Sequence, residues 1–158
     1  MKKYFKITSI FFISLLLISC GFKKINSSNS KNYTIENINI NGDNRIGYLV
    51  KNEIFLNSSK NSENQIDITL RISKRKNAKE KNISGRIKKY TLELIINVTV
   101  DEINSSRTIK RNFTKSIDYD VMGNHSDTIN VERKTTIKAT ELITEDIVNF
   151  LIIAYRNK

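Results

Sequence analysis

The chain has 158 residues, enough for one domain and hardly for two. Its 39% hydrophobic and 27% charged residues fit a folded globular domain better than a disordered chain, and its single cysteine excludes an internal disulfide. The net charge of +11 favours partners that carry phosphate, anionic lipid or acidic protein surface, and it says little about the fold.

The N-terminus has the pattern of a signal peptide. Lys2, Lys3 and Lys6 form a positive start, and an apolar run from Ile7 to Ser19 follows. The 13 residues of this run match the core of a signal peptide, about 7–15 residues, and fall short of the roughly 20 that a membrane-spanning helix needs. We therefore predict that residues 1–19 are a signal peptide.

The apolar run leads into Leu17-Ile18-Ser19-Cys20-Gly21, which resembles the bacterial lipobox. The resemblance implies that the thiol of Cys20 is lipidated and that the signal peptidase cuts before it, where the small Ser19 fits. Several acyl chains, at about 0.8 kcal/mol per buried methylene, would hold the protein on a membrane. Gly21 stands where an Asp would retain a lipoprotein in the inner membrane, which favours the outer membrane. The alternative is an uncleaved anchor with an incidental cysteine.

The segment after the cysteine, residues 20–32, is small and polar and predicts a lipidated tether. Residues 33–158 are expected to form a single α+β domain. Three of the 27 basic residues lie before Cys20, so 24 remain against 16 acidic ones, and the domain itself is basic.

The domain is expected to begin with a strand from Tyr33 to Ile40. A turn over residues 41–44 follows, with Asn, Gly and Asp residues suited to capping a helix. Apolar residues from Ile46 to about Leu56 have helical spacing. Residues 57–64 predict a Ser/Asn-rich loop.

Alternation of apolar and polar residues predicts three further strands, which are Ile66–Ser73, Tyr90–Val100 and Thr108–Tyr119. Residues 101–106 are expected to join the last two as a hairpin loop. Strict alternation indicates a sheet with one apolar face and one wet face.

A final helix from about Asp127 places five apolar residues on one face: Ile143, Ile147, Phe150, Leu151 and Ala154. The predicted order is therefore β-α-β-β-β-α. The first strand–helix–strand step should be a right-handed parallel crossover, and the later strands should pair antiparallel. The expected fold is a two-layer α+β domain, a four-stranded and mostly antiparallel sheet covered on one face by two helices.

The sequence shows no catalytic constellation. His125, expected in a loop, is the single histidine, and no second His or nearby Cys completes a dyad or a metal site. Glu145 and Asp146 fit the solvated face of a helix, and the five glycines form no phosphate-binding loop. We expect a protein that is not an enzyme and uses neither cofactor nor metal.

Positive charge is concentrated between Ser73 and Tyr90, a stretch predicted as a long loop between strands with Glu80 as its one acid. Arg and Lys there would make charge-assisted bonds to headgroup or sugar phosphates. The alternative is a loop kept soluble by its charge. Nucleic acid would also suit the charge, but export takes the protein away from it. The candidate anion-binding residues are Lys74, Arg75, Lys76, Arg86, Lys88 and Lys89.

From Cys20 to its C-terminus the chain resembles the lipopolysaccharide-assembly lipoprotein (LptE) family. Cys20-Gly21-Phe22 is similar to the family's start, with Lys23-Lys24 where the family usually has a proline. Tyr90–Asp120 resembles its long hairpin, and Ile129–Tyr155 its terminal helix. The order of elements is also the family's order.

The resemblance implies a subunit without enzymatic activity, lipid-anchored at Cys20 and facing the periplasm from the outer membrane. Proteins of the family plug a large outer-membrane β-barrel (LptD-like), assist its folding and contact the lipopolysaccharide that it delivers to the cell surface. A different possibility is a pilot or binding lipoprotein that escorts another outer-membrane complex. A lipid carrier would need a large apolar cavity, for which the strands are too few and too one-sided.

Overall fold

The elements follow one another as the sequence predicts, in a computed structural model that describes residues 32–156. They are β1 (Thr34–Gly42), α2 (Asn44–Leu56), β2 (Gln65–Lys81), β3 (Ile87–Glu102), β4 (Thr108–Asp120) and α3 (His125–Ala154). The predicted signal peptide, Cys20 and nearly all of the tether lie outside the described residues.

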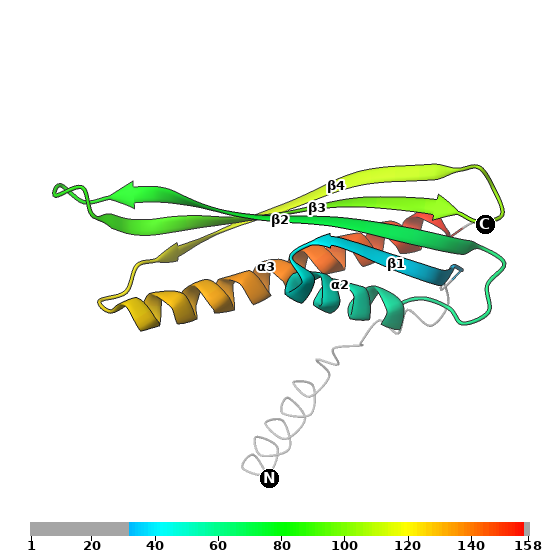
Figure 1. Ribbon diagram of the computed structural model, residues 1–158, viewed down its shortest axis with the longest axis horizontal. Helices are drawn as coiled ribbons and strands as arrows, with labels where there is room; N and C mark the ends of the chain where they lie inside the picture. The colour runs from blue at the N-terminus through cyan, green and yellow to red at the C-terminus, as the bar shows by residue number, and fades with distance from the viewer. Residues whose placement is uncertain (1–31, 157–158) are drawn as a thin grey trace, which may run out of the picture.

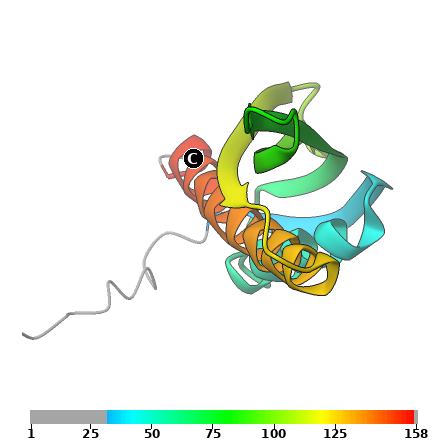
Figure 2. The same cartoon turned by 90° about the vertical axis from the view of Figure 1, so that its left-hand side faces the viewer.

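The four strands form one sheet in the order β1-β2-β3-β4. β1 pairs with β2 in parallel, while β2–β3 and β3–β4 are antiparallel. Both helices lie on the same side of this sheet (Figure 1), and the end-on view shows the sheet curving around them (Figure 2). The predicted fold class, a two-layer α+β domain with a mostly antiparallel sheet, is confirmed.

The core lies between the sheet and the helices, where the alternating residues predict it. Leu92, Leu94 and Ile96 of the inner strand β3 have no exposed surface. Ile143 and Ile147 of α3 are also fully buried. Burial of each such side chain stabilises the fold by about 1.5–3 kcal/mol.

The turn before α2 is built as its composition indicates. Asp43 caps the helix, because its Oδ1 accepts hydrogen bonds from the backbone N–H groups of Arg45 and Ile46 at 3.0 and 3.1 Å. Gly42 has φ +112°, and a Cβ there would lie 2.1 Å from the carbonyl oxygen of Ile72. Only glycine fits this position, both in conformation and in space.

Two local predictions are wrong. The stretch between Ser73 and Tyr90 is not a long loop: β2 continues to Lys81, β3 begins at Ile87, and only residues 82–86 connect them. The backbones of β2 and β3 remain paired there, but no β2 side chain beyond Ile72 is buried. Because nothing on this part of β2 is buried, its sequence lacks the apolar alternation that predicts a strand. His125 is not in a loop either, since it is the first residue of α3. Asn124 caps that helix by accepting from the N–H of Asp127 at 2.7 Å.

Candidate anion-binding hairpin and open sheet face

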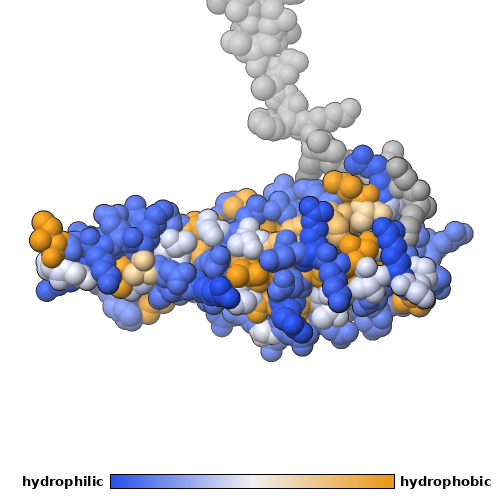
Figure 3. Space-filling view, turned by 90° about the horizontal axis from the view of Figure 1, so that it is seen from above, coloured by the Kyte–Doolittle hydropathy of each residue, from blue (hydrophilic) through white to orange (hydrophobic). Residues whose placement is uncertain are grey.

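The distal parts of β2 and β3 form an extension of the sheet that we call the basic hairpin, residues 73–90. It reaches the far end of the molecule's long axis, at the left in Figure 1. Its turn is held by Asn82, whose Oδ1 accepts from the N–H of Arg86 at 2.8 Å, and by Gly85 at φ +78°. Ile83 is fully exposed at this tip, and hydrophilic residues cover most of the side shown in Figure 3.

The hairpin's strand geometry divides the candidate residues between two faces. Lys74 and Lys76 continue the phase of Ile72 and point to the helix side. Arg75 and Lys89 point to the opposite side, which no helix covers. Arg86 and Lys88 are not assigned to either face, because Arg86 lies in the turn and Lys88 lies where the pairing of β2 and β3 is irregular. The six residues therefore do not form one continuous patch.

Three of the six candidates form an ion pair within the domain. The Nζ of Lys76 lies 2.7 Å from Glu132, Arg75 lies 3.9 Å from Glu93, and Lys89 lies 3.6 Å from Asp120. Within residues 32–156, Lys74, Arg86 and Lys88 form no ion pair, and all three are exposed. These three cations are free to meet an anion.

The contact of Lys76 belongs to a cluster that joins the hairpin to α3. The Tyr119 hydroxyl donates to Glu132 Oε2 at 2.9 Å, and Lys76 donates to the same oxygen. The Lys76 Nζ also lies 4.9 Å above the ring of Tyr90, which stacks on Tyr119. Burial alone would raise the pKa of Glu132, but the hydrogen bonds from Lys76 and Tyr119 outweigh it and lower that pKa.

This cluster gives a pH-dependent prediction. Because the pKa of Glu132 is lower in the folded than in the unfolded chain, its stabilisation is present above the ordinary carboxyl pKa of 4.5 and is lost as pH falls through the folded value. Glu132→Gln should lower the free energy of unfolding by about 1 kcal/mol at pH 7 and by much less at pH 3. Urea unfolding at both pH values measures this, with the exposed Glu141→Gln as control. Equal losses at both pH values would contradict the assignment.

The side of the sheet that the helices leave uncovered, which we call the open face, carries a second group of cations. The strand register places Arg71 beside Asn97 and Lys110 beside Thr99. A shallow depression is formed there by Thr69, Arg71, Asn97, Val98, Thr99, Lys110, Arg111 and Asn112. Sequence reasoning missed Arg71 and Lys110, because each is an isolated basic residue in the polar phase of its own strand. Only the register brings them together.

Carboxylates of the open face are already hydrogen-bonded to neighbours. Asp118 accepts hydrogen bonds from Lys79 and Thr91, and these bonds, above all the one from Lys79, lower its pKa. Asp101 accepts from the Thr108 hydroxyl at 2.6 Å, and Asp67 from an Asn37 amide at 3.0 Å. In contrast, Arg71 and Lys110 form no ion pair within residues 32–156. The open face therefore presents two unpaired cations, Arg71 and Lys110, beside two carboxylates, Asp67 and Asp101, whose hydrogen-bond partners are neutral.

Neither a metal site nor a membrane-spanning helix is found in the described part of the chain. Residues 32–156 contain no group of three or more His, Cys, Asp or Glu side chains placed to hold a metal ion. His125 is exposed at the start of α3. Over the same residues, no helix has both the length and the apolar character required to cross a membrane.

Comparison with known proteins identifies the fold. No protein-family model matches the chain, and no curated protein matches its sequence. Solved structures do match. The crystal structure of the rare lipoprotein B from Shewanella oneidensis superposes with a TM-score of 0.52 at 12% identity, covering 75% of this chain and 94% of that one. A protein described as a lipoprotein from Caulobacter crescentus gives 0.54 at 16% identity, covering 78% and 92%.

These identities are low, so the likeness is one of fold. The chain has the fold of structures described as bacterial lipoproteins, and the match extends over nearly the whole of those structures.

Proposed function

We propose that this protein is an outer-membrane lipoprotein, anchored at Cys20, that acts by binding rather than by catalysis. In this proposal the domain plugs an LptD-like β-barrel, assists its folding and takes part in the delivery of lipopolysaccharide to the cell surface. The observation that carries the proposal is the open face, a four-stranded surface of amides, hydroxyls and unpaired cations that no helix covers. The lipobox-like segment and the lipoprotein fold support the export and anchoring.

The open face suits the inside of a large barrel, because the walls of such a lumen are polar. Asn97, Thr99 and Asn112 present side chains that donate and accept hydrogen bonds, so the face matches polar groups without hydrophobic burial. An uncovered apolar face would instead need a lipid or an apolar partner surface.

The basic hairpin supplies the proposed contact with glycolipid. Phosphate groups accept charge-assisted hydrogen bonds from Lys and Arg, which are about twice as strong as neutral ones. Lys74, Arg86 and Lys88 are exposed and unpaired among the described residues, so binding a phosphate does not require an internal ion pair to break.

Charge reversal tests this contact. The triple variant Lys74→Glu, Arg86→Glu, Lys88→Glu should bind lipopolysaccharide at least about tenfold more weakly, a change of about 1.4 kcal/mol. Wild-type binding should weaken as salt rises, since the Debye length falls from about 8 Å at 0.15 M to about 3 Å at 1 M. Retention of a barrel should survive both the variant and the salt, because it would depend on broad shape-matched burial.

The matched control reverses three cations away from the hairpin: Lys51, Lys60 and Arg156. It makes the same change in net charge and should leave lipopolysaccharide binding nearly unchanged. Equal weakening in both triple variants would mean that net charge, and not the hairpin, attracts the glycolipid. Binding that is unchanged in the hairpin variant would remove the hairpin from the site.

A further inference from the structure

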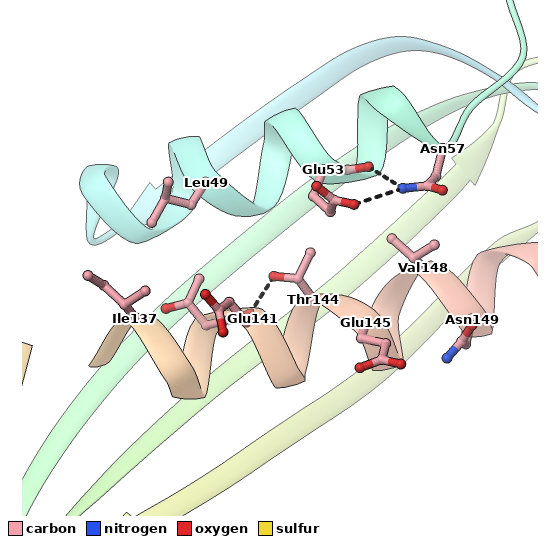
Figure 4. Close-up of a pocket in the computed structure, with 10 residues that line it drawn as sticks. Leu49, Glu53, Asn57, Ile137, Glu141, Thr144, Glu145, Val148 and Asn149 are labelled. Carbon is pink, nitrogen blue, oxygen red and sulfur yellow. Dashed lines mark hydrogen bonds between the residues drawn. The ribbon is translucent and has the colours of Figure 1, made fainter. Parts of the chain in front are cut away.

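A groove runs between α2 and α3, on the side of these helices turned away from the sheet (Figure 4). One depression lies near the C-terminal end of α2, between Glu53, Asn57 and Val148, and another near its N-terminal end, between Arg45, Tyr48 and Ile129. Both are lined by Leu49, Ile137 and Thr140, so they form one continuous groove along α2. The helix has 13 residues, which corresponds to a length of about 20 Å.

The walls of the groove expose apolar side chains. Leu49 and Ile137 face each other across it and are each 45% exposed. Tyr48 and Ile129 continue the apolar surface toward the N-terminal end of α2, at 63% and 50% exposure. Four large apolar residues gathered along one groove differ from the singly scattered ones that protein surfaces normally carry.

The floor of the groove is formed by threonines of α3 whose hydroxyls are satisfied within their own helix. Thr136, Thr140 and Thr144 each donate to the carbonyl oxygen four residues earlier, at 2.9, 2.8 and 2.6 Å. Because the hydroxyls are bonded in this way, an apolar side chain seated on the floor would leave none of these three donors without a partner. The floor accepts apolar groups.

The two ends of the groove differ in charge. Three exposed carboxylates, Glu53, Glu141 and Glu145, lie at the end near Asn57, in a chain with a net charge of +11. Glu141 forms an exposed ion pair with Lys138 at 3.5 Å, and Glu53 accepts from the Asn57 amide at 3.2 Å, contacts that solvent screens strongly. The other end carries the cations Arg45, Lys74 and Arg133. The carboxylates at that second end are engaged, since Asp43 caps α2 and Glu132 binds Lys76 and Tyr119.

We propose that this groove binds an amphipathic helix of a partner protein. The apolar stripe of that helix lies on Leu49, Ile137 and the threonine floor, and its Lys or Arg side chains lie beside Glu141 and Glu145. A helix fits because its backbone groups are already hydrogen-bonded, and an apolar stripe at i, i+3, i+4 and i+7 matches a groove between two helices. This site lies on the helix side of the domain and is separate from the open face, so it does not depend on the proposed barrel contact.

The sign of the charge preference makes the proposal testable. Two synthetic helical peptides of about 14 residues share one leucine stripe and differ only in carrying Lys or Glu at the polar positions. The protein is basic overall, so non-specific attraction would favour the Glu peptide. The groove predicts the opposite order, with the Lys peptide binding the mature chain about tenfold more tightly.

Variants locate the binding in the groove. Glu141→Lys with Glu145→Lys should abolish or reverse the preference, whereas the control Glu36→Lys with Glu63→Lys, the same charge change outside the groove, should preserve it. Leu49→Gln with Ile137→Gln should weaken binding of the Lys peptide. Both positions are partly exposed, so they can accept polar residues without unfolding the domain. Thermal melting of each variant confirms folding.

Several results would overturn the proposal. One is a stronger affinity for the Glu peptide, and another is no binding of the Lys peptide at concentrations on the order of 1 mM. Equal effects of the groove and control charge variants would also do so. A dimer in analytical ultracentrifugation that dissociates in the Leu49→Gln, Ile137→Gln variant would assign the groove to a second copy instead. None of these results bears on lipopolysaccharide or barrel binding.

Discussion

Leu94→Asp is expected to unfold the domain, while Glu93→Lys at the next position is expected to change stability little. Leu94 has no exposed surface and lies on β3, which pairs on both sides and faces the helices. A carboxylate there would be buried without a partner, at a cost above about 4 kcal/mol. Domains of this size have a total stability of only about 5–15 kcal/mol.

Glu93 is the matched control because it lies on the open face of the same strand. Its ion pair with Arg75 is long, at 3.9 Å, and Arg75 is largely exposed. Reversing its charge should therefore cost at most about 1 kcal/mol. Circular dichroism during thermal melting compares the two variants. Similar losses of stability would mean that the assigned register of β3 is incorrect.

Cys20→Ala is expected to remove the lipid anchor completely. The expectation rests on the apolar run that ends at Ser19 and on the lipobox-like segment around Cys20, which is the chain's single cysteine. Radiolabelled palmitate should enter the wild type and not the variant. Because cleavage follows lipidation of the thiol, the variant should also keep its apolar segment Ile7–Ser19 and run as the larger, uncleaved precursor on a gel.

Persisting label in Cys20→Ala would contradict the lipoprotein assignment. A matched control is Ser27→Ala, a small-residue change within the predicted tether, which should keep full label and membrane attachment.

The fold was predictable from the sequence wherever one face of an element is buried. Leu92, Leu94 and Ile96 alternate with polar neighbours because β3 has helices on one side and none on the other. The turn before α2 was predictable for a different reason, since Gly42 and Asp43 are needed there by backbone conformation and by capping.

The candidate site was only partly predictable, because strands that are exposed to solvent on both faces show no alternation of apolar and polar residues in the sequence. The hairpin beyond Ile72 is paired along most of its length yet exposed, so its sequence shows no apolar alternation and resembles a loop. Arg71 and Lys110 come together through strand register, which a single sequence does not specify. The groove was missed since Thr140 and Thr144 have polar side chains whose hydroxyls turn back to their own helix.

The central claim is that this protein acts as the partner of an outer-membrane barrel, and purification from native membranes tests it most directly. The tagged full chain would be isolated from detergent-solubilised outer membranes, washed at 1 M salt, and its companions identified and quantified by mass spectrometry. We expect one large β-barrel protein in stoichiometric amount, retained at high salt. Recovery of a different complex would indicate a pilot lipoprotein, and recovery of lipid without a protein partner would indicate a carrier. Either of these results would show that the protein is not the partner of an outer-membrane barrel.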